Sequence, residues 1–183
     1  MTSLDDDLSV NRNAYADSNI IKASAVYNLR HEIERIHAAF LNEAQAKQID
    51  LSIVFTGDIP VVYWDMDSLR SHVFSNILSR SISNTPIGGK IEICVKKLDD
   101  YTMLIKISDS GQHISKNEME NIFHNPKIHD HPINNNDVGL KSALLCIEAH
   151  KGMLSIVDEP SFTGATFKIE IPSYSLCISD VFP

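Results

Sequence analysis

Two polar side chains fall at positions where a folded chain could hold them rigidly beside a cleft. Asn76 lies in the middle of a segment with helical apolar periodicity, and Asp109 ends a segment with the pattern of a strand. An amide covered by its neighbours must find a hydrogen-bond partner, or it costs about 1–3 kcal/mol. A carboxylate at the end of a strand, followed by the Ser110-Gly111 turn, is placed to accept hydrogen bonds. The pattern makes both side chains candidates for polar roles.

Several histidines are candidates for metal binding or for a role as a base. His124, His129, Asp130 and His131 lie in a polar, irregular stretch of residues 124–138, and loops longer than about 12 residues are usually functional or disordered. A transition metal bound there would need a further ligand from elsewhere, and the alternative is a solvated loop. His72, one helical turn before Asn76, is a candidate base, with packing at a core or rim position as the alternative.

The helix that must position Asn76 is predicted over residues 65–84. Its apolar residues recur at the i, i+3, i+4 and i+7 spacing of a buried stripe. Asp65 and Asp67 are suited to capping its start, and Thr85-Pro86 followed by Gly88-Gly89 is expected to end it.

The remaining pattern predicts paired strands interrupted by helices. Strands are expected at 20–27, 51–55, 61–64, 90–97, 103–108, 153–158 and 166–171, and helices at 29–48 (capped by Asn28), 116–123 and 139–150. This order predicts an α+β fold, a two-layer sandwich whose mixed, mostly antiparallel sheet is covered on one face by helices. We expect a lead-in at 1–19, one domain at 20–175 and a tail at 176–183.

The composition and net charge argue against several classes of function. The net charge of −8 and a pI near 5.4 argue against nucleic-acid binding. No apolar run approaches the ~20 residues that a membrane span needs, and no signal peptide is recognisable, so we expect a cytoplasmic protein without direct membrane contact. Cys94, Cys146 and Cys177 are scattered in apolar contexts and are expected to be reduced, mostly buried thiols.

Four stretches, in order, resemble the catalytic and ATP-binding domain of two-component sensor histidine kinases, whose ATPase fold is shared with gyrase and Hsp90. Residues 65–91 are similar to the N box and the strand after it, and residues 107–123 to the G1 box and F-box helix. Residues 137–152 are similar to the G2 helix, and residues 164–172 to the G3 segment. The resemblance covers about 140 residues and implies the fold, although fold alone does not establish activity.

The resemblance implies roles for the N-box residues. In the family this helix carries two polar residues one turn apart, the second of which helps to hold Mg²⁺. Here Asn76 fills the first position, as a weak metal ligand, and Arg80 stands at the second. A guanidinium has donors but no lone pair to offer a metal, so we expect normal Mg²⁺ binding to be lost. Arg80 could instead pair with a phosphate, or point to solvent.

The other boxes imply contacts to the nucleotide. Asp109 would accept a hydrogen bond from the adenine amino group, although a plain turn residue is the alternative, and Thr166 could contact the base. Gly111, Ile114, Gly139 and Leu140 are the remaining candidate binding residues. In place of the glycine-rich G2 loop the chain has Asn135-Asn136-Asp137-Val138 before Gly139, which weakens the expected phosphate cradle.

The resemblance therefore implies a domain that binds ATP or ADP, with Mg²⁺ in doubt, in a phosphorelay. Its implied partners are the dimerisation and acceptor-histidine domain of a kinase and a response regulator. His31 lies ahead of the N box, in the domain's own first helix, so we do not expect it to be the phosphate acceptor. The function expected is a histidine-kinase nucleotide-binding domain with impaired Mg-ATP binding and catalysis. The alternative is an inactive regulatory or scaffold domain that acts through protein contacts.

Overall fold

Alternating apolar residues build a five-stranded sheet. The computed structural model describes residues 24–114 and 135–174. In spatial order the strands are β2 (Asp50–Thr56), β4 (Lys90–Lys97), β5 (Thr102–Asp109), β7 (Thr166–Pro172) and β6 (Met153–Val157). The β2–β4 pair is parallel, and the other neighbours are antiparallel.

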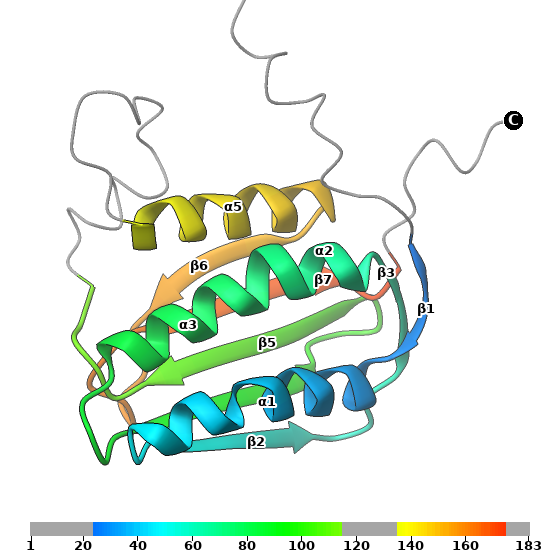
Figure 1. The fold of residues 1–183 in the computed structure, drawn as a ribbon. Helices are drawn as coiled ribbons and strands as arrows, with labels where there is room; N and C mark the ends of the chain where they lie inside the picture. Colours follow the sequence, from blue (N-terminus) through cyan, green and yellow to red (C-terminus); the bar gives the residue numbers. More distant parts are fainter. Residues whose placement is uncertain (1–23, 115–134, 175–183) are drawn as a thin grey trace, which may run out of the picture.

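Helices cover one face of this sheet (Figure 1). They are α1 (Leu29–Ala46), the consecutive segments α2 (Met66–Ser68), η1 (Leu69–Phe74) and α3 (Ser75–Asn84), and α5 (Asn135–Ala149). In the described residues the opposite face carries no helix, as expected for strands that alternate apolar and polar side chains. The predicted two-layer α+β sandwich is confirmed.

The middle helix carries the predicted apolar stripe with one change of geometry. All six stripe residues are at most 2% exposed; they are Leu69, Val73, Phe74, Ile77, Leu78 and Ile82. The stretch η1 is π-helical, with the Ser75 amide donating to the Arg70 carbonyl, five residues earlier. Such wide turns inside helices occur frequently at functional sites.

A second, two-stranded sheet closes one end of the domain. It pairs β1 (Ala25–Asn28) with β3 (Val61–Trp64), and the Trp64 indole N–H donates to the Pro172 carbonyl at 2.6 Å. Asn28 ends β1 and caps α1, as predicted, because its side chain accepts a hydrogen bond from the His31 amide at 3.1 Å.

Among the predicted boundaries that the structure describes, the largest errors are at the first strand and at the start of α5. The first strand begins at Ala25 and extends through Asn28. The predicted helix start at Gly139 is wrong, because α5 already begins at Asn135, so the predicted loop at 124–138 does not extend beyond residue 134; its residues 124–134 lie outside the described part of the chain. An asparagine run followed by an acidic residue is acceptable at a helix start, where the peptide dipole favours negative charge. The predicted lead-in 1–19, the helix at 116–123 and the tail 176–183 lie outside the described residues.

Among the described residues, no helix is both long enough and apolar enough to cross a bilayer.

Candidate functional site

Asp109 is fully buried at the end of β5, where donors from three parts of the chain meet its carboxylate. Oδ2 accepts a hydrogen bond from the Ser81 hydroxyl of α3 at 2.9 Å. Oδ1 accepts from the backbone amides of Gly111 at 2.9 Å and Ala165 at 3.2 Å. A carboxylate offers about four lone-pair positions, so these three bonds leave Oδ2 able to accept one more. The strand-end carboxylate is therefore held in one orientation with acceptor capacity left.

Two glycines allow the backbone to close around this carboxylate. A Cβ on Gly164 would lie 2.1 Å from Asp109 Oδ1, and one on Gly111 would lie 2.6 Å from the Asn84 carbonyl oxygen. Neither distance is compatible with a side chain. The glycines are therefore required by close approach, which is the usual reason for glycine where backbone meets a ligand or another chain segment.

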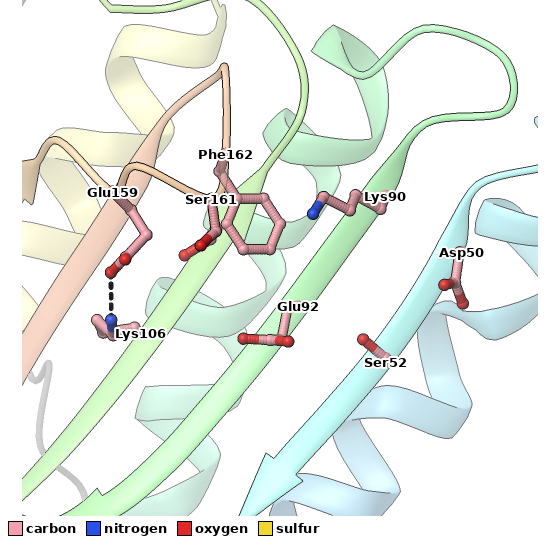
Figure 2. Close-up of a pocket in the computed structure, with 9 residues that line it drawn as sticks. Asp50, Ser52, Lys90, Glu92, Lys106, Glu159, Ser161 and Phe162 are labelled. Carbon is pink, nitrogen blue, oxygen red and sulfur yellow. Dashed lines mark hydrogen bonds and ion pairs between the residues drawn. The ribbon is translucent and has the colours of Figure 1, made fainter.

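The loop that carries Gly164 is anchored on the open face of the sheet (Figure 2). Glu159 pairs with Lys106 of β5, and Lys90 Nζ lies 4.3 Å from the centre of the Phe162 ring. These residues line a polar hollow of about 310 Å³. Its two lysines already face an anion or an aromatic ring, so we interpret the hollow as the anchorage of the loop.

Thr166 does not lie beside Asp109. Its hydroxyl donates to Ser108 Oγ at 3.0 Å, and Ser108 lines the hollow on the open face. Strand alternation puts Ala165, the neighbour of Asp109 across the β5–β7 pair, on the helix-covered face instead. The prediction that Thr166 contacts a base would therefore require a ligand on the opposite face from Asp109.

Asn76 joins the middle helix to α5. Its Nδ2 donates to the His72 carbonyl at 2.7 Å, and a Cβ on Gly139 would approach its Oδ1 to 3.0 Å. Gly139 thus lies one turn inside α5 and gives the amide oxygen room. His72 Nδ1 lies 3.0 Å from the Ser142 hydroxyl of α5, which places this histidine in helix–helix packing.

Arg80 lies one turn after Asn76 on α3, over the sheet. Its guanidinium carbon is 5.7 Å from the centre of the Phe167 ring, and Phe167 is buried on β7. The Arg80 side chain is half-buried, with Nε and Nη1 inaccessible to solvent. A permanent positive charge therefore stands on the same helix as Asn76 and Ser81.

The described residues do not suit Mg²⁺ at this position. Asn76 Oδ1 is one neutral oxygen, and Arg80 contributes only donors and positive charge. Groups of three or more His, Cys, Asp or Glu side chains arranged for a metal are absent from the described part of the chain. The loop residues His124, His129, Asp130 and His131 lie outside it.

The other predicted binding residues are in the core. Ile114 is 1% exposed and Leu140 is fully buried, and both belong to the main apolar cluster. They stabilise the walls of the site. Ser81 and Ala165 were missed by the sequence reasoning, because their bonds to Asp109 join residues 28 and 56 positions apart.

A buried polar cluster lies between the end of α5 and the start of α2, away from Asp109. His150 is fully buried, with Nδ1 2.8 Å from the Cys146 carbonyl oxygen. Burial lowers the pKa of His150, against the opposing effects of the Cys146 carbonyl and Asp65. Burial also raises the pKa of the Cys146 thiol to about 12.

Comparison with known proteins identifies the family to which this fold belongs. Residues 65–175 match the family model described as histidine kinase-, DNA gyrase B-, and HSP90-like ATPase. The chain belongs to this family, and its fold is that of the nucleotide-binding domain of sensor histidine kinases.

The individual proteins to which the chain is similar are sensor kinases. The chain is 30% identical, over 75% of its length, to the adaptive-response sensory kinase SasA of Synechococcus sp. (strain JA-3-3Ab), but spans only 36% of that protein. The catalytic domain of histidine kinase ThkA superposes with a TM-score of 0.73 at 22% identity, covering 84% of this chain and 98% of that domain. ThkA is also known in complex with the response regulator TrrA, with a TM-score of 0.68 at 22% identity, covering 82% of this chain and 42% of that one. Full-length ShkA with AMPPNP superposes with a TM-score of 0.72 at 17% identity, covering 86% and 33%.

Proposed function

We propose that this domain binds ATP or ADP as the nucleotide-binding part of a sensor histidine kinase, with impaired Mg-ATP binding and catalysis. The observation that carries nucleotide binding is the geometry of Asp109. Its carboxylate is fixed by Ser81, Gly111 and Ala165 and can accept one more N–H, the group that an adenine amino function offers. Family membership supports the same ligand.

Impaired chemistry follows from the N-box residues. Phosphoryl transfer depends on metal ions that bridge the phosphates and on exact positioning of the reacting groups. Arg80 cannot supply the oxygen ligand that such an ion requires. We expect slow or undetectable phosphotransfer to an acceptor-histidine domain supplied separately, and we propose that domain and a response regulator as the cytoplasmic partners. The second of these is the type of partner bound to ThkA.

The test is calorimetric titration with ADP and ATP. The unaltered chain should bind, and Asp109→Asn should weaken binding at least about tenfold, because an amide cannot accept every bond that the carboxylate accepts. Asp99→Asn is the matched control: Asp99 bonds the Tyr101 amide in an exposed turn. Thermal unfolding without nucleotide checks that both variants fold. An unaltered chain that binds neither nucleotide would refute the proposal.

The alternative is a regulatory or scaffold domain that acts through protein contacts. The observation that favours it is again Arg80, since a domain without metal-dependent chemistry keeps only its binding and contact functions. Absence of nucleotide binding, together with capture of an acceptor-histidine domain or a response regulator, would select this alternative.

A further inference from the structure

The small sheet of β1 and β3, at one end of the domain, carries a row of apolar and aromatic side chains on its outward side (Figure 1). Val26 lies directly opposite Tyr63 in the antiparallel pair, and Tyr63 forms a parallel bridge with Tyr174. Paired residues on neighbouring strands point to the same side of a sheet, so these three side chains form one row. The alternate residues of β3, Val62 and Trp64, are fully buried and mark the inward side.

This outward side is exposed and uncharged. Val26 is 67% exposed and Tyr174 62%, and Val61, two residues before Tyr63 on β3, is 48% exposed. Val61 is paired with Asn28, and we call these five residues the outward face. Single exposed apolar residues are ordinary, whereas a contiguous group of them marks a surface that another segment or molecule covers.

The chain itself continues from the outward face. The Tyr63 amide donates to the Ser173 carbonyl at 3.0 Å, which fixes the last described residues beside β3. Residues 175–183, outside the described part of the chain, follow Tyr174 directly and include one charged residue, Asp180. Five of these nine residues are apolar: Leu176, Cys177, Ile178, Val181 and Phe182. A segment tethered this closely has an effective concentration on the order of mM at the face, which favours it over a separate molecule.

The segment that precedes β1 fits the outward face less well. Residues 1–23 include three consecutive carboxylates, Asp5, Asp6 and Asp7. Burying a carboxylate is costly unless a cation or hydrogen-bond donors pair with it, and none of the five residues of the face is a cation. Charge and tethering therefore both favour the segment that follows Tyr174.

We infer that residues 175–183 cover the outward face, with their apolar side chains packed against Val26, Val61 and Tyr63. In the described residues β1 pairs only with β3, and a two-stranded sheet is marginally stable by itself. The covering segment supplies the second layer that this small sheet otherwise lacks. The inference is independent of nucleotide binding.

Urea denaturation of paired variants of the full chain tests the contact. The segment variant, Leu176→Ser with Phe182→Ser, should lower the equilibrium constant for folding at least about tenfold, because it loses buried apolar surface. Val26→Asp places a charge on the outward face and should lower the constant by a similar factor. In a chain with all three substitutions the two losses should not add, since either change alone already releases the segment.

Ile87→Asp is the matched control for the introduced charge. Ile87 is 72% exposed in the turn between α3 and β4, so its loss should be small and should add to that of the segment variant. The inference is wrong if the segment variant is as stable as the unaltered chain, or if its loss and that of Val26→Asp add in full. Stability of the unaltered chain that rises with protein concentration would assign the face to a second copy of this chain and would also overturn the inference.

Discussion

At the scale of single residues, the site depends on glycines, which have no side chain, as much as on its polar residues. Asp109 collects one hydroxyl and two backbone amides only because Gly111 and Gly164 let the backbone come within bonding distance. Gly139 similarly leaves room for the Asn76 side chain, since a Cβ there would lie 3.0 Å from Oδ1. Glycine at these positions is required by contact, whereas Gly57 and Gly88 are required by positive φ.

Gly164→Ala tests this requirement. The new methyl group would lie 2.1 Å from Asp109 Oδ1, so the loop or the carboxylate must move. Overpacking of this kind costs about 1–3 kcal/mol, and we expect that loss of unfolding free energy in urea denaturation together with weaker nucleotide binding.

Gly57→Ala is the control, because open space surrounds Gly57, whose φ is +74°. Its strain should cost about 1–2 kcal/mol without any change in nucleotide affinity. Equal nucleotide affinity in Gly164→Ala and the unaltered chain would contradict the role given to this contact.

The cysteines give a second prediction at this scale. Burial raises the pKa of Cys146 to about 12, so little thiolate forms at mildly alkaline pH, whereas Cys94 is half-buried. The thiolate is the reactive form. Mass spectrometry after iodoacetamide treatment of the native protein should find Cys94 modified before Cys146, which stays protected until the protein unfolds. Rapid native labelling of Cys146 would show that its pocket opens.

The sequence pattern singled out Asn76 and Asp109 but not the residues that contact them. Asn76 and Asp109 were predicted because helical periodicity and strand endings are local properties of the chain. Ser81 and Ala165 were not, because their roles arise from contacts across the fold. Thr166 shows the limit most clearly: a shift of one residue along a strand moves a side chain to the other face, and no local pattern fixed that register.

At the scale of elements, the middle helix is held at both ends. At its start, the Asp65 carboxylate accepts bonds from the Ser68 amide at 3.0 Å and the Ser68 hydroxyl at 2.8 Å. At its end, Lys47 Nζ donates to the carbonyls of Ile82, Ser83 and Thr85 at 2.6–3.1 Å. A cation on the last carbonyls also complements the helix dipole. These contacts fix the element that carries Asn76, Arg80 and Ser81.

Asp65→Ala tests the cap. The residue is 2% exposed, so the variant loses an N-cap and leaves buried donors unsatisfied, at a cost of about 1–3 kcal/mol. Asp67→Ala is a close control on the same first turn. Asp67 is exposed and pairs with Arg70, and such pairs contribute less than about 1 kcal/mol. Unfolding in urea should separate the two variants, and equal losses would show that the buried cap contributes nothing beyond a surface charge.

Sequence patterns predicted most elements and failed at particular boundaries. The strands at 61–64 and 90–97 match the structure in full, since the first is a short run of β-branched and aromatic residues and the second alternates, and turn residues precede both. The start of α5 was missed because three asparagines in succession are typical of loops. The π-helical turn was missed because it leaves the apolar stripe intact.

At the scale of the whole molecule, the open face of the sheet, the helical layer and the site depend on one another. The loop that brings Gly164 to Asp109 is anchored on the open face through Lys106 and Phe162, while the carboxylate itself faces the helices. Sheet order β2-β4-β5-β7-β6 places β5 at the centre, flanked by β4 and β7. The site therefore forms at the end of the central strand of the sheet, and we expect its geometry to persist as long as the sheet is folded.

The pH dependence of global stability provides a test through His150. The groups facing this ring are the Cys146 carbonyl and Asp65, both of which raise its pKa, but burial outweighs them and lowers it. The folded protein therefore holds His150 neutral, whereas in the unfolded chain it takes up a proton near the ordinary pKa of about 6.5. Below that pH the unfolded state binds more protons, so the free energy of unfolding should decrease as pH falls from neutrality towards the lowered pKa of the folded state.

Urea denaturation at a series of pH values measures this slope. His150→Gln should be less stable at neutral pH and should lose part of the decrease seen on acidification, because the titrating group is gone. His31→Gln removes an exposed histidine at the start of α1 and should keep the full decrease. A slope that is the same in His150→Gln and the unaltered chain would mean that other groups govern acid stability. A decrease confined to the chains that retain His150 would identify the junction of α5 and α2 as the point where protonation destabilises the fold.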